Sequence, residues 1–122
     1  MTKKRIFVAC SDERLRIALL LLIDHEPGMT VVGITDRLPN LLSQLWATQP
    51  DILLLDWELA LADIEELIAD IRNLPHRPMI TVLSGKPEDE EKIIAAGTDH
   101  FILKDAPPDD LLPIISSYLV TS

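Results

Sequence analysis

Asp56, Ser84 and Lys104 each come directly after a short apolar segment of the sequence. A carboxylate that lies near an ammonium group and a hydroxyl can act as a nucleophile towards phosphorus, because both neighbours stabilise negative charge on phosphoryl oxygens. Any one of these residues alone is a common, solvated residue at a strand end. Three suitable side chains at such positions instead favour a common site, provided that the fold brings them to one edge.

Apolar segments typical of strands alternate with segments of helical period along the chain. The expected strands are residues 4–10, 30–34, 51–56, 79–83 and 101–103, and the expected helices are residues 14–24, 38–48, 61–73, 88–96 and 107–118. Ser11 is the expected N-cap of the first helix, and Gly97 closes the fourth. This alternation predicts an α/β protein, (βα)5, with a doubly wound parallel five-stranded sheet. Ligands bind such sheets beyond the carboxyl ends of the strands, where the three side chains are expected.

The size, charge and hydropathy of the chain disfavour nucleic-acid-binding and membrane-spanning proteins. The chain has 122 residues, 11 of them basic and 20 acidic, and a net charge of −9. We expect a single domain over residues 1–122, and no direct binding of nucleic acid, because the negative charge would repel phosphates. The longest uninterrupted apolar run, residues 17–23, is far shorter than the roughly 20 residues of a membrane-spanning helix. The single cysteine, Cys10, calls for no oxidising compartment, and we expect a cytoplasmic protein without a membrane partner.

Three motifs together resemble the response-regulator receiver family of two-component signalling. The run Asp51-Ile52-Leu53-Leu54-Leu55-Asp56 is similar to the family's phosphoacceptor strand, and Leu83-Ser84-Gly85 is similar to its Ser/Thr strand end. The block from Ala96 to Lys104 resembles the family's Gly-Ala-Asp-x-aromatic-x-x-Lys motif. The resemblance implies a flavodoxin-like sheet with strand order 2-1-3-4-5. Residues 103–107 further resemble receivers that precede helix-turn-helix transcription modules.

The resemblance implies a phosphorylation-gated switch and not an enzyme. Asp56 is the implied phosphoacceptor, Ser84 the residue that bonds the phosphoryl group, and Lys104 the cation that pairs with it. Phe101 stands where the family has its switch aromatic. The implied partners are a sensor histidine kinase or a phosphotransfer protein. A second copy of the chain is a further implied partner, through the face made by the fourth helix, fifth strand and fifth helix.

The two adjacent acidic residues with which the family binds Mg²⁺ are missing. Aligning the helix that follows places Cys10 and Ser11 at those positions. Mg²⁺ prefers octahedral oxygen ligands. The remaining candidate ligands are Asp56, the main-chain carbonyl of Glu58 and the side chain of Asp12. We therefore expect weak Mg²⁺ binding.

Two other hypotheses remain open. Loss of the acidic pair favours a pseudo-receiver, an interaction module that keeps the fold and acts without phosphate. An enzyme of the same fold is disfavoured. A flavodoxin-like redox protein needs a phosphate loop with glycine where the chain has Cys10-Ser11-Asp12-Glu13, and an aspartate-nucleophile phosphatase usually has a second aspartate where the chain has Glu58.

The remaining conspicuous residues are interpreted individually. Trp57 follows the acceptor directly and is interpreted as a cover over the site or as an exposed contact, whereas Trp46, with leucine neighbours at helical spacing, is expected in the core. Cys10 is expected to behave as a small buried hydrophobe. The histidines lack the spacing of a metal site and are expected to be solvated. The acidic run at residues 88–91 is expected to stabilise a helix N-terminus through the helix dipole.

Overall fold

The structure is a computed structural model that describes residues 3–59, 64–104 and 113. The strands are β1 (Lys4–Ala9), β2 (Met29–Thr35), β3 (Ile52–Asp56), β4 (Met79–Ser84) and β5 (His100–Leu103). The helices are α1 (Glu13–Asp24), α2 (Leu41–Thr48), α3 (Ile64–Arg72) and α4 (Glu90–Ala95), with a short 3-10 turn, η1 (Pro87–Asp89), before α4. The predicted fifth helix, residues 107–118, lies outside the described residues. Within the described ranges no helix is long and apolar enough to cross a membrane.

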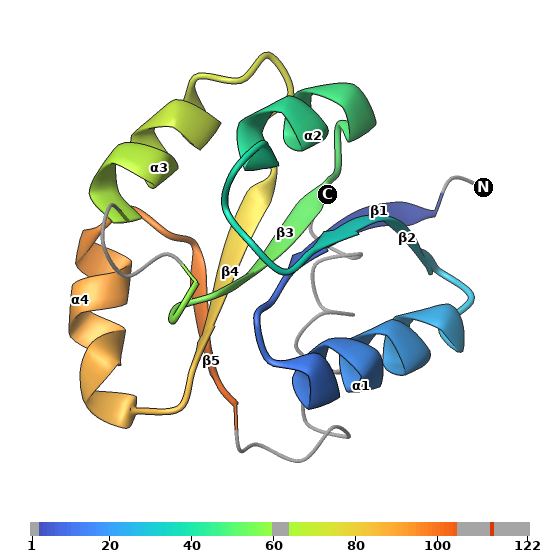
Figure 1. Ribbon diagram of the computed structural model, residues 1–122, viewed down its shortest axis with the longest axis horizontal. Coiled ribbons are helices and arrows are strands. Elements are labelled where there is room, and N and C mark those ends of the chain that lie inside the picture. Colours follow the sequence, from blue (N-terminus) through green and yellow to red (C-terminus); the bar gives the residue numbers. More distant parts are fainter. Residues whose placement is uncertain (1–2, 60–63, 105–112, 114–122) are drawn as a thin grey trace.

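The strands form one parallel sheet in the order β2-β1-β3-β4-β5, which confirms the predicted topology (Figure 1). β3 lies at the centre of this sheet and pairs with β1 on one side and β4 on the other. Every residue of β3 is buried, because its run of isoleucine and leucine supplies apolar side chains to both faces. Both faces of the sheet therefore have to be covered by helices.

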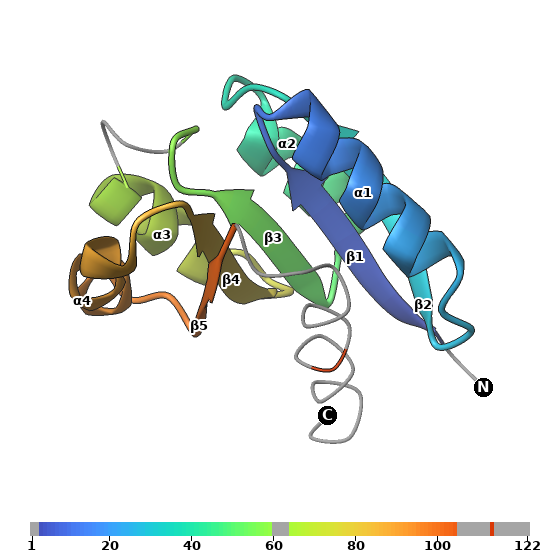
Figure 2. The same ribbon diagram turned by 90° about the horizontal axis from the view of Figure 1, so that it is seen from below.

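Two apolar clusters fill the two faces of the sheet. The first cluster joins Leu19 and Ile23 of α1 to β-strand residues such as Ile6 and Val8. The second joins the alternate strand residues, such as Phe7, to buried residues of α2, α3 and α4. Figure 1 shows α1 apart from the group formed by α2, α3 and α4, and Figure 2 shows α1 along β1 while α3 and α4 lie at the β4–β5 side. The described helices thus cover both faces, as a doubly wound sheet requires.

The start of α1 differs from the expectation. Asp12, and not Ser11, is the N-cap, because the Oδ1 atom of Asp12 accepts a hydrogen bond from the backbone amide of Leu15 at 3.2 Å. The hydroxyl of Ser11 is directed instead at a carboxylate on β3. At the end of α4 the prediction is confirmed, since Gly97 has a φ of 102°, a left-handed conformation that favours glycine after a helix.

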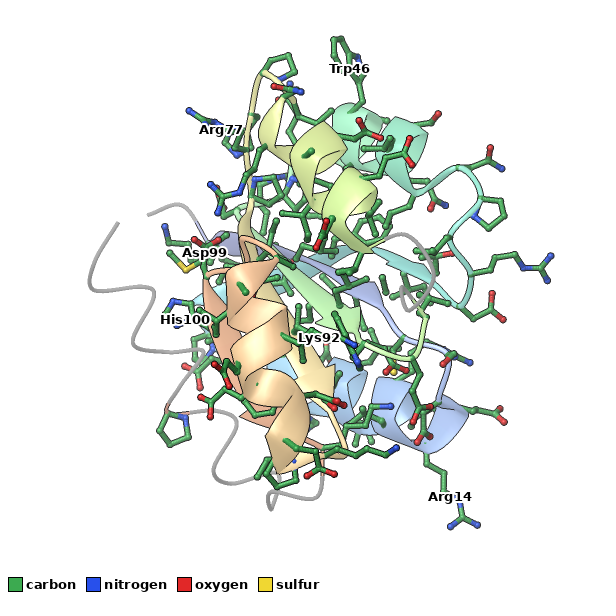
Figure 3. The ribbon with its side chains drawn as sticks, turned by 90° about the vertical axis from the view of Figure 1, so that its left-hand side faces the viewer. Arg14, Trp46, Arg77, Lys92, Asp99 and His100 are labelled. Carbon is green, nitrogen blue, oxygen red and sulfur yellow. The ribbon has the colours of Figure 1, made fainter. Side chains whose placement is uncertain are left out.

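The two tryptophans differ strongly in burial. Trp46 is 62% exposed, whereas Trp57 is only 4% exposed and belongs to the second apolar cluster. In α2 the buried positions are Leu41 and Leu45, and the next residue points about 100° away around a helix. Figure 3 shows Trp46 projecting away from the body of the molecule. The prediction of a core Trp46 is therefore wrong. For Trp57 the exposed contact is wrong as well, and the other alternative, a cover over the site, stays a prediction.

Candidate functional site

The strand register brings the predicted residues to one edge of the sheet. Asp56, the last residue of β3, is paired with Leu83 of β4, so that Ser84 comes one residue beyond this pair. Ser84 is in turn paired with Leu103 of β5, and Lys104 comes next along the chain. Because parallel strands end in the same direction, these three residues lie at the carboxyl edge of the sheet. The structure thus confirms the predicted location of all three.

Lys104 forms an ion pair with Asp56 in a shielded environment. The Nζ atom of Lys104 lies 2.7 Å from Oδ1 of Asp56, and the two side chains are 13% and 0% exposed. Burial by itself raises the pKa of Asp56, but the hydrogen bonds from Lys104 and Ser11, and the charge of Lys104, bring this pKa below its ordinary value. Burial likewise lowers the pKa of Lys104, yet the contact with Asp56 raises it overall. Both groups are therefore charged at neutral pH.

The other carboxylate oxygen of Asp56 faces the loop after β1. Oδ2 accepts a hydrogen bond from the hydroxyl of Ser11 at 2.9 Å and one from the backbone amide of Ser11 at 3.3 Å. The Sγ atom of Cys10 lies 3.8 Å from the same oxygen. Burial raises the pKa of the Cys10 thiol to about 11, so that the thiol stays protonated at neutral pH. Two neutral side chains thus contact Asp56 where the family has carboxylates.

Ser84 lies at the edge but points its hydroxyl at a neighbour that the sequence did not reveal. Its Oγ atom donates a hydrogen bond to Oδ2 of Asp89 at 2.8 Å and accepts one from the backbone amide of Lys86 at 3.1 Å. The sequence pattern by itself places Asp89 only at a helix N-terminus. The available signal was the spacing, since an acid five residues after a strand-end hydroxyl can fold back across a short turn.

An open cavity lies beside this edge. Its volume is about 430 Å³, and it is lined by Trp57, Glu58, Ser84, Gly85, Lys86 and Asp89. Its lining therefore includes an ammonium group, two carboxylates and the hydroxyl of Ser84, a residue that is itself buried. A small anionic group that enters here would meet charges of both signs.

The other predicted site residues have separate places. The backbone amide of Glu58 donates to Oδ1 of Asp56 at 3.1 Å, and the Glu58 side chain lies 3.6 Å from Nζ of Lys104. Asp12 uses one carboxylate oxygen as the cap of α1. Phe101 in β5 is half-buried against the second apolar cluster. Glu58 thus joins the site directly, whereas Asp12 and Phe101 have structural contacts of their own.

These residues do not fit a magnesium site of the receiver type. Mg²⁺ is held by hard oxygen ligands, of which one or two are usually carboxylates. Here a protonated thiol and a hydroxyl stand beside Asp56, and the hydroxyl of Ser11 donates its proton to the oxygen that a cation would need. The described residues contain no group of three or more His, Cys, Asp or Glu side chains placed to hold a metal ion. The site therefore offers one buried carboxylate and its own positive partner.

Comparison with known proteins points to one family. The sequence model of the response regulator receiver domain matches residues 6–116. The nitrate/nitrite response regulator protein NarL of Escherichia coli (strain K12) is 30% identical over 100 residues, which are 80% of this chain and 46% of that protein. The chain thus spans about half the length of the curated relatives that it matches.

Solved structures show the same fold. The signal receiver domain of the putative response regulator NarL from Mycobacterium tuberculosis has a TM-score of 0.83 at 21% identity and covers 96% of both chains. The receiver domain of sensor histidine kinase PA1611 from Pseudomonas aeruginosa PAO1, solved with a magnesium ion coordinated in the active site cleft, has a TM-score of 0.78 at 17% identity and covers 95% of this chain and 97% of that one. At such identities the likeness establishes the fold alone.

Proposed function

Because this chain belongs to the response regulator receiver domain family of two-component signalling, we propose that it is a phosphorylation-gated switch with Asp56 as its phosphoacceptor. The observation that carries the proposal is the buried ion pair between Asp56 and Lys104. Lowering of its pKa keeps the Asp56 carboxylate ionised, as a nucleophile must be. Lys104 provides a positive charge beside the oxygens of an incoming phosphoryl group.

The transfer itself requires little covalent chemistry from the chain. An oxygen of Asp56 attacks phosphorus, an O–P bond forms, and the bond from phosphorus to the donor breaks, so that the donor leaves with the electron pair. The proposed donor is a phosphohistidine of a sensor kinase or of a phosphotransfer protein. Lys104 and the Ser11 hydroxyl hold the carboxylate in position, and both have to share their hydrogen bonds with the new phosphoryl oxygens.

The proposed output is a changed protein surface around β5. Ser84 at the end of β4 is paired with Leu103 of β5, and Phe101 lies in the same strand against the second cluster. A shift of Ser84 towards a phosphoryl group would also displace β5, which pairs with β4, and α4, which packs beside β5. We propose that this face binds a partner or a second copy of the chain.

A second candidate function is that of a pseudo-receiver, and the loop after β1 favours it. Ser11 and Cys10 contact the same oxygen of Asp56, and the described residues supply no set of metal-binding acids. In such a protein Asp56 and Lys104 would lock the carboxyl edge in one conformation. Partner binding would then be independent of phosphate.

Intact-mass measurement after incubation with acetyl phosphate separates the two candidates. We expect the wild-type chain and Asp51→Asn to gain one phosphoryl group, and Asp56→Asn to gain none. Asp51 is a matched control because it precedes the same strand but lies at the opposite edge of the sheet. Absence of any adduct on the folded wild-type chain, with acetyl phosphate and with a phosphorylated donor protein, would favour the pseudo-receiver.

A further inference from the structure

We propose that Asp89 is a positioning residue that holds the hydroxyl of Ser84 in a resting orientation, and that this contact limits how readily the acceptor site changes state. The inference rests on the proposed function for its kinetic part. Its structural part, the control of Ser84 by Asp89, stands on the contacts of the unmodified chain.

The hydroxyl of Ser84 is fully engaged away from the acceptor. A serine hydroxyl has one proton to donate, and here that proton goes to Oδ2 of Asp89 at 2.8 Å. The Oγ atom of Ser84 also accepts a hydrogen bond from the backbone amide of Lys86 at 3.1 Å. Ser84 is buried, so a broken hydrogen bond at this hydroxyl would not simply be replaced by bulk water. To bond a phosphoryl oxygen on Asp56, Ser84 has to release Asp89.

The chain between the two residues is a short, exposed turn. Gly85, Lys86, Pro87 and Glu88 are exposed, and a side chain added at Gly85 would meet no atom within 4 Å. The backbone amide of Asp89 donates to the carbonyl of Lys86 at 3.1 Å and closes η1. Two hydrogen bonds therefore join this turn to the hydroxyl of Ser84, one from the backbone amide of Lys86 and one to the carboxylate of Asp89.

The charge of Asp89 adds to its effect on the hydroxyl. Asp89, Glu58 and Lys86 line the cavity that also contains Ser84. A phosphoryl group at Asp56 brings further negative charge to this edge. The carboxylate of Asp89 competes with the phosphoryl group for the single proton of the Ser84 hydroxyl. The same carboxylate also repels the negatively charged phosphoryl group. Both effects favour the resting arrangement until phosphorylation is complete.

Two substitutions separate the hydrogen bond from the charge. Asp89→Asn keeps an oxygen that can accept from Ser84 but removes the charge, whereas Asp89→Ala removes both. Glu91→Ala is the control, since Glu91 is an exposed acid two residues further along. Removing one hydrogen bond of this kind corresponds to about a fivefold change in rate, or ~1 kcal/mol. We expect Asp89→Ala to accept phosphate from acetyl phosphate about fivefold faster than wild type, and Asp89→Asn to show a smaller gain.

Dependence on Ser84 shows whether Asp89 acts through that hydroxyl. In the Ser84→Ala background, Asp89→Ala should give no further acceleration by a hydrogen-bond route, so that any acceleration that remains measures charge alone. An equal acceleration with and without Ser84 would overturn the positioning role. An unchanged rate in Asp89→Ala, with wild type modified, would overturn the kinetic part.

Side-chain couplings of Ser84 measured by NMR on the unmodified proteins test the structural part without any phosphate. We expect one rotamer in wild type, Asp89→Asn and Glu91→Ala, and rotamer averaging in Asp89→Ala. The same single rotamer in all four proteins would overturn the inference. If no chain is modified but Asp89→Ala releases Ser84, the proposed function fails while the control of Ser84 by Asp89 stands.

Discussion

Two aspartates flank the same strand, and their surroundings differ. Asp51 precedes β3 at the amino edge of the sheet. There its Oδ2 atom accepts a hydrogen bond from the backbone amide of Arg5 at 2.9 Å, and its Oδ1 atom lies 3.5 Å from Nε2 of His76. Asp56 ends β3 at the carboxyl edge, 2.7 Å from Nζ of Lys104. The side chain of Asp51 is 30% exposed and that of Asp56 is fully buried.

The comparison teaches that burial, and not residue type, distinguishes the candidate site. An ion pair in contact with water contributes little to the free energy of unfolding, because solvent screens the attraction and the side chains lose conformational freedom. In a buried pair each charge depends on its partner, since neither can be solvated if the other is removed. Each edge also has a tryptophan near it. Trp57 directly follows Asp56 at the carboxyl edge. Trp46 lies two residues before Thr48, and the carbonyl of Thr48 accepts a hydrogen bond from the side chain of Arg5, whose backbone amide bonds Asp51 at the amino edge.

Truncation of the two tryptophans should give the largest contrast. Trp57→Ala should lower the free energy of unfolding by about 4 kcal/mol, because a large buried side chain is lost from the second cluster. Trp46→Ala should change it by no more than about 0.5 kcal/mol, as for other exposed residues. Urea unfolding followed by far-UV circular dichroism measures both. Similar losses in the two variants would contradict the placement of these side chains.

Removal of the partner of each aspartate should give the next largest difference. Lys104→Met keeps most of the side-chain stem but leaves Asp56 buried without a positive partner, at a cost of about 3 kcal/mol in unfolding free energy. His76→Ala should cost about 0.5 kcal/mol or less, because Asp51 stays in contact with water. Equal costs would mean that the Asp56 pair is better solvated than its burial indicates. The measurement is urea unfolding at pH 7.

Asp56 should also contribute to acid unfolding. Since the folded-state pKa of Asp56 lies below its ordinary value, its stabilising effect is present above the unfolded pKa of about 3.9 and is lost as the pH falls through the lower folded pKa. Unfolding free energies from about pH 6 to about pH 2 should show this loss in wild type and Asp51→Asn. Asp56→Asn should lack it. A steeper acid loss in Asp56→Asn than in Asp51→Asn would contradict the assignment.

A carboxylate added at the carboxyl edge should give the smallest effect and sharpen the metal question. Ser11→Asp places a second negative charge beside Asp56 and supplies an oxygen ligand, whereas Ser11→Asn changes the shape without the charge. We expect Mg²⁺ to stabilise Ser11→Asp by about 1 kcal/mol when its free concentration is about five times Kd. Wild type and Ser11→Asn should gain less. Thermal unfolding with and without Mg²⁺ measures this, and an equal gain in wild type would mean that the present residues already bind the cation.

The positions of the site residues could be predicted because they depend on local pattern. Asp56, Ser84 and Lys104 each follow an apolar run, and in a parallel sheet such runs end at one edge. The hydrogen-bond partners could not be predicted in the same way. The sequence predicts Ser11 as the cap of α1, but its hydroxyl donates to Asp56. The sequence predicts Asp89 only at a helix N-terminus, but its carboxylate accepts a hydrogen bond from Ser84.

The sequence by itself determined the order and type of the described elements, the central place of the apolar β3, and the three chemical groups at the strand ends. Tertiary structure alone decided which neutral groups contact Asp56, which residue holds Ser84, and which tryptophan is buried. The reason is that hydrophobic period and turn residues act over a few positions along the chain. Hydrogen bonds and burial depend instead on strand register and helix rotation, which are fixed by packing between segments far apart in sequence.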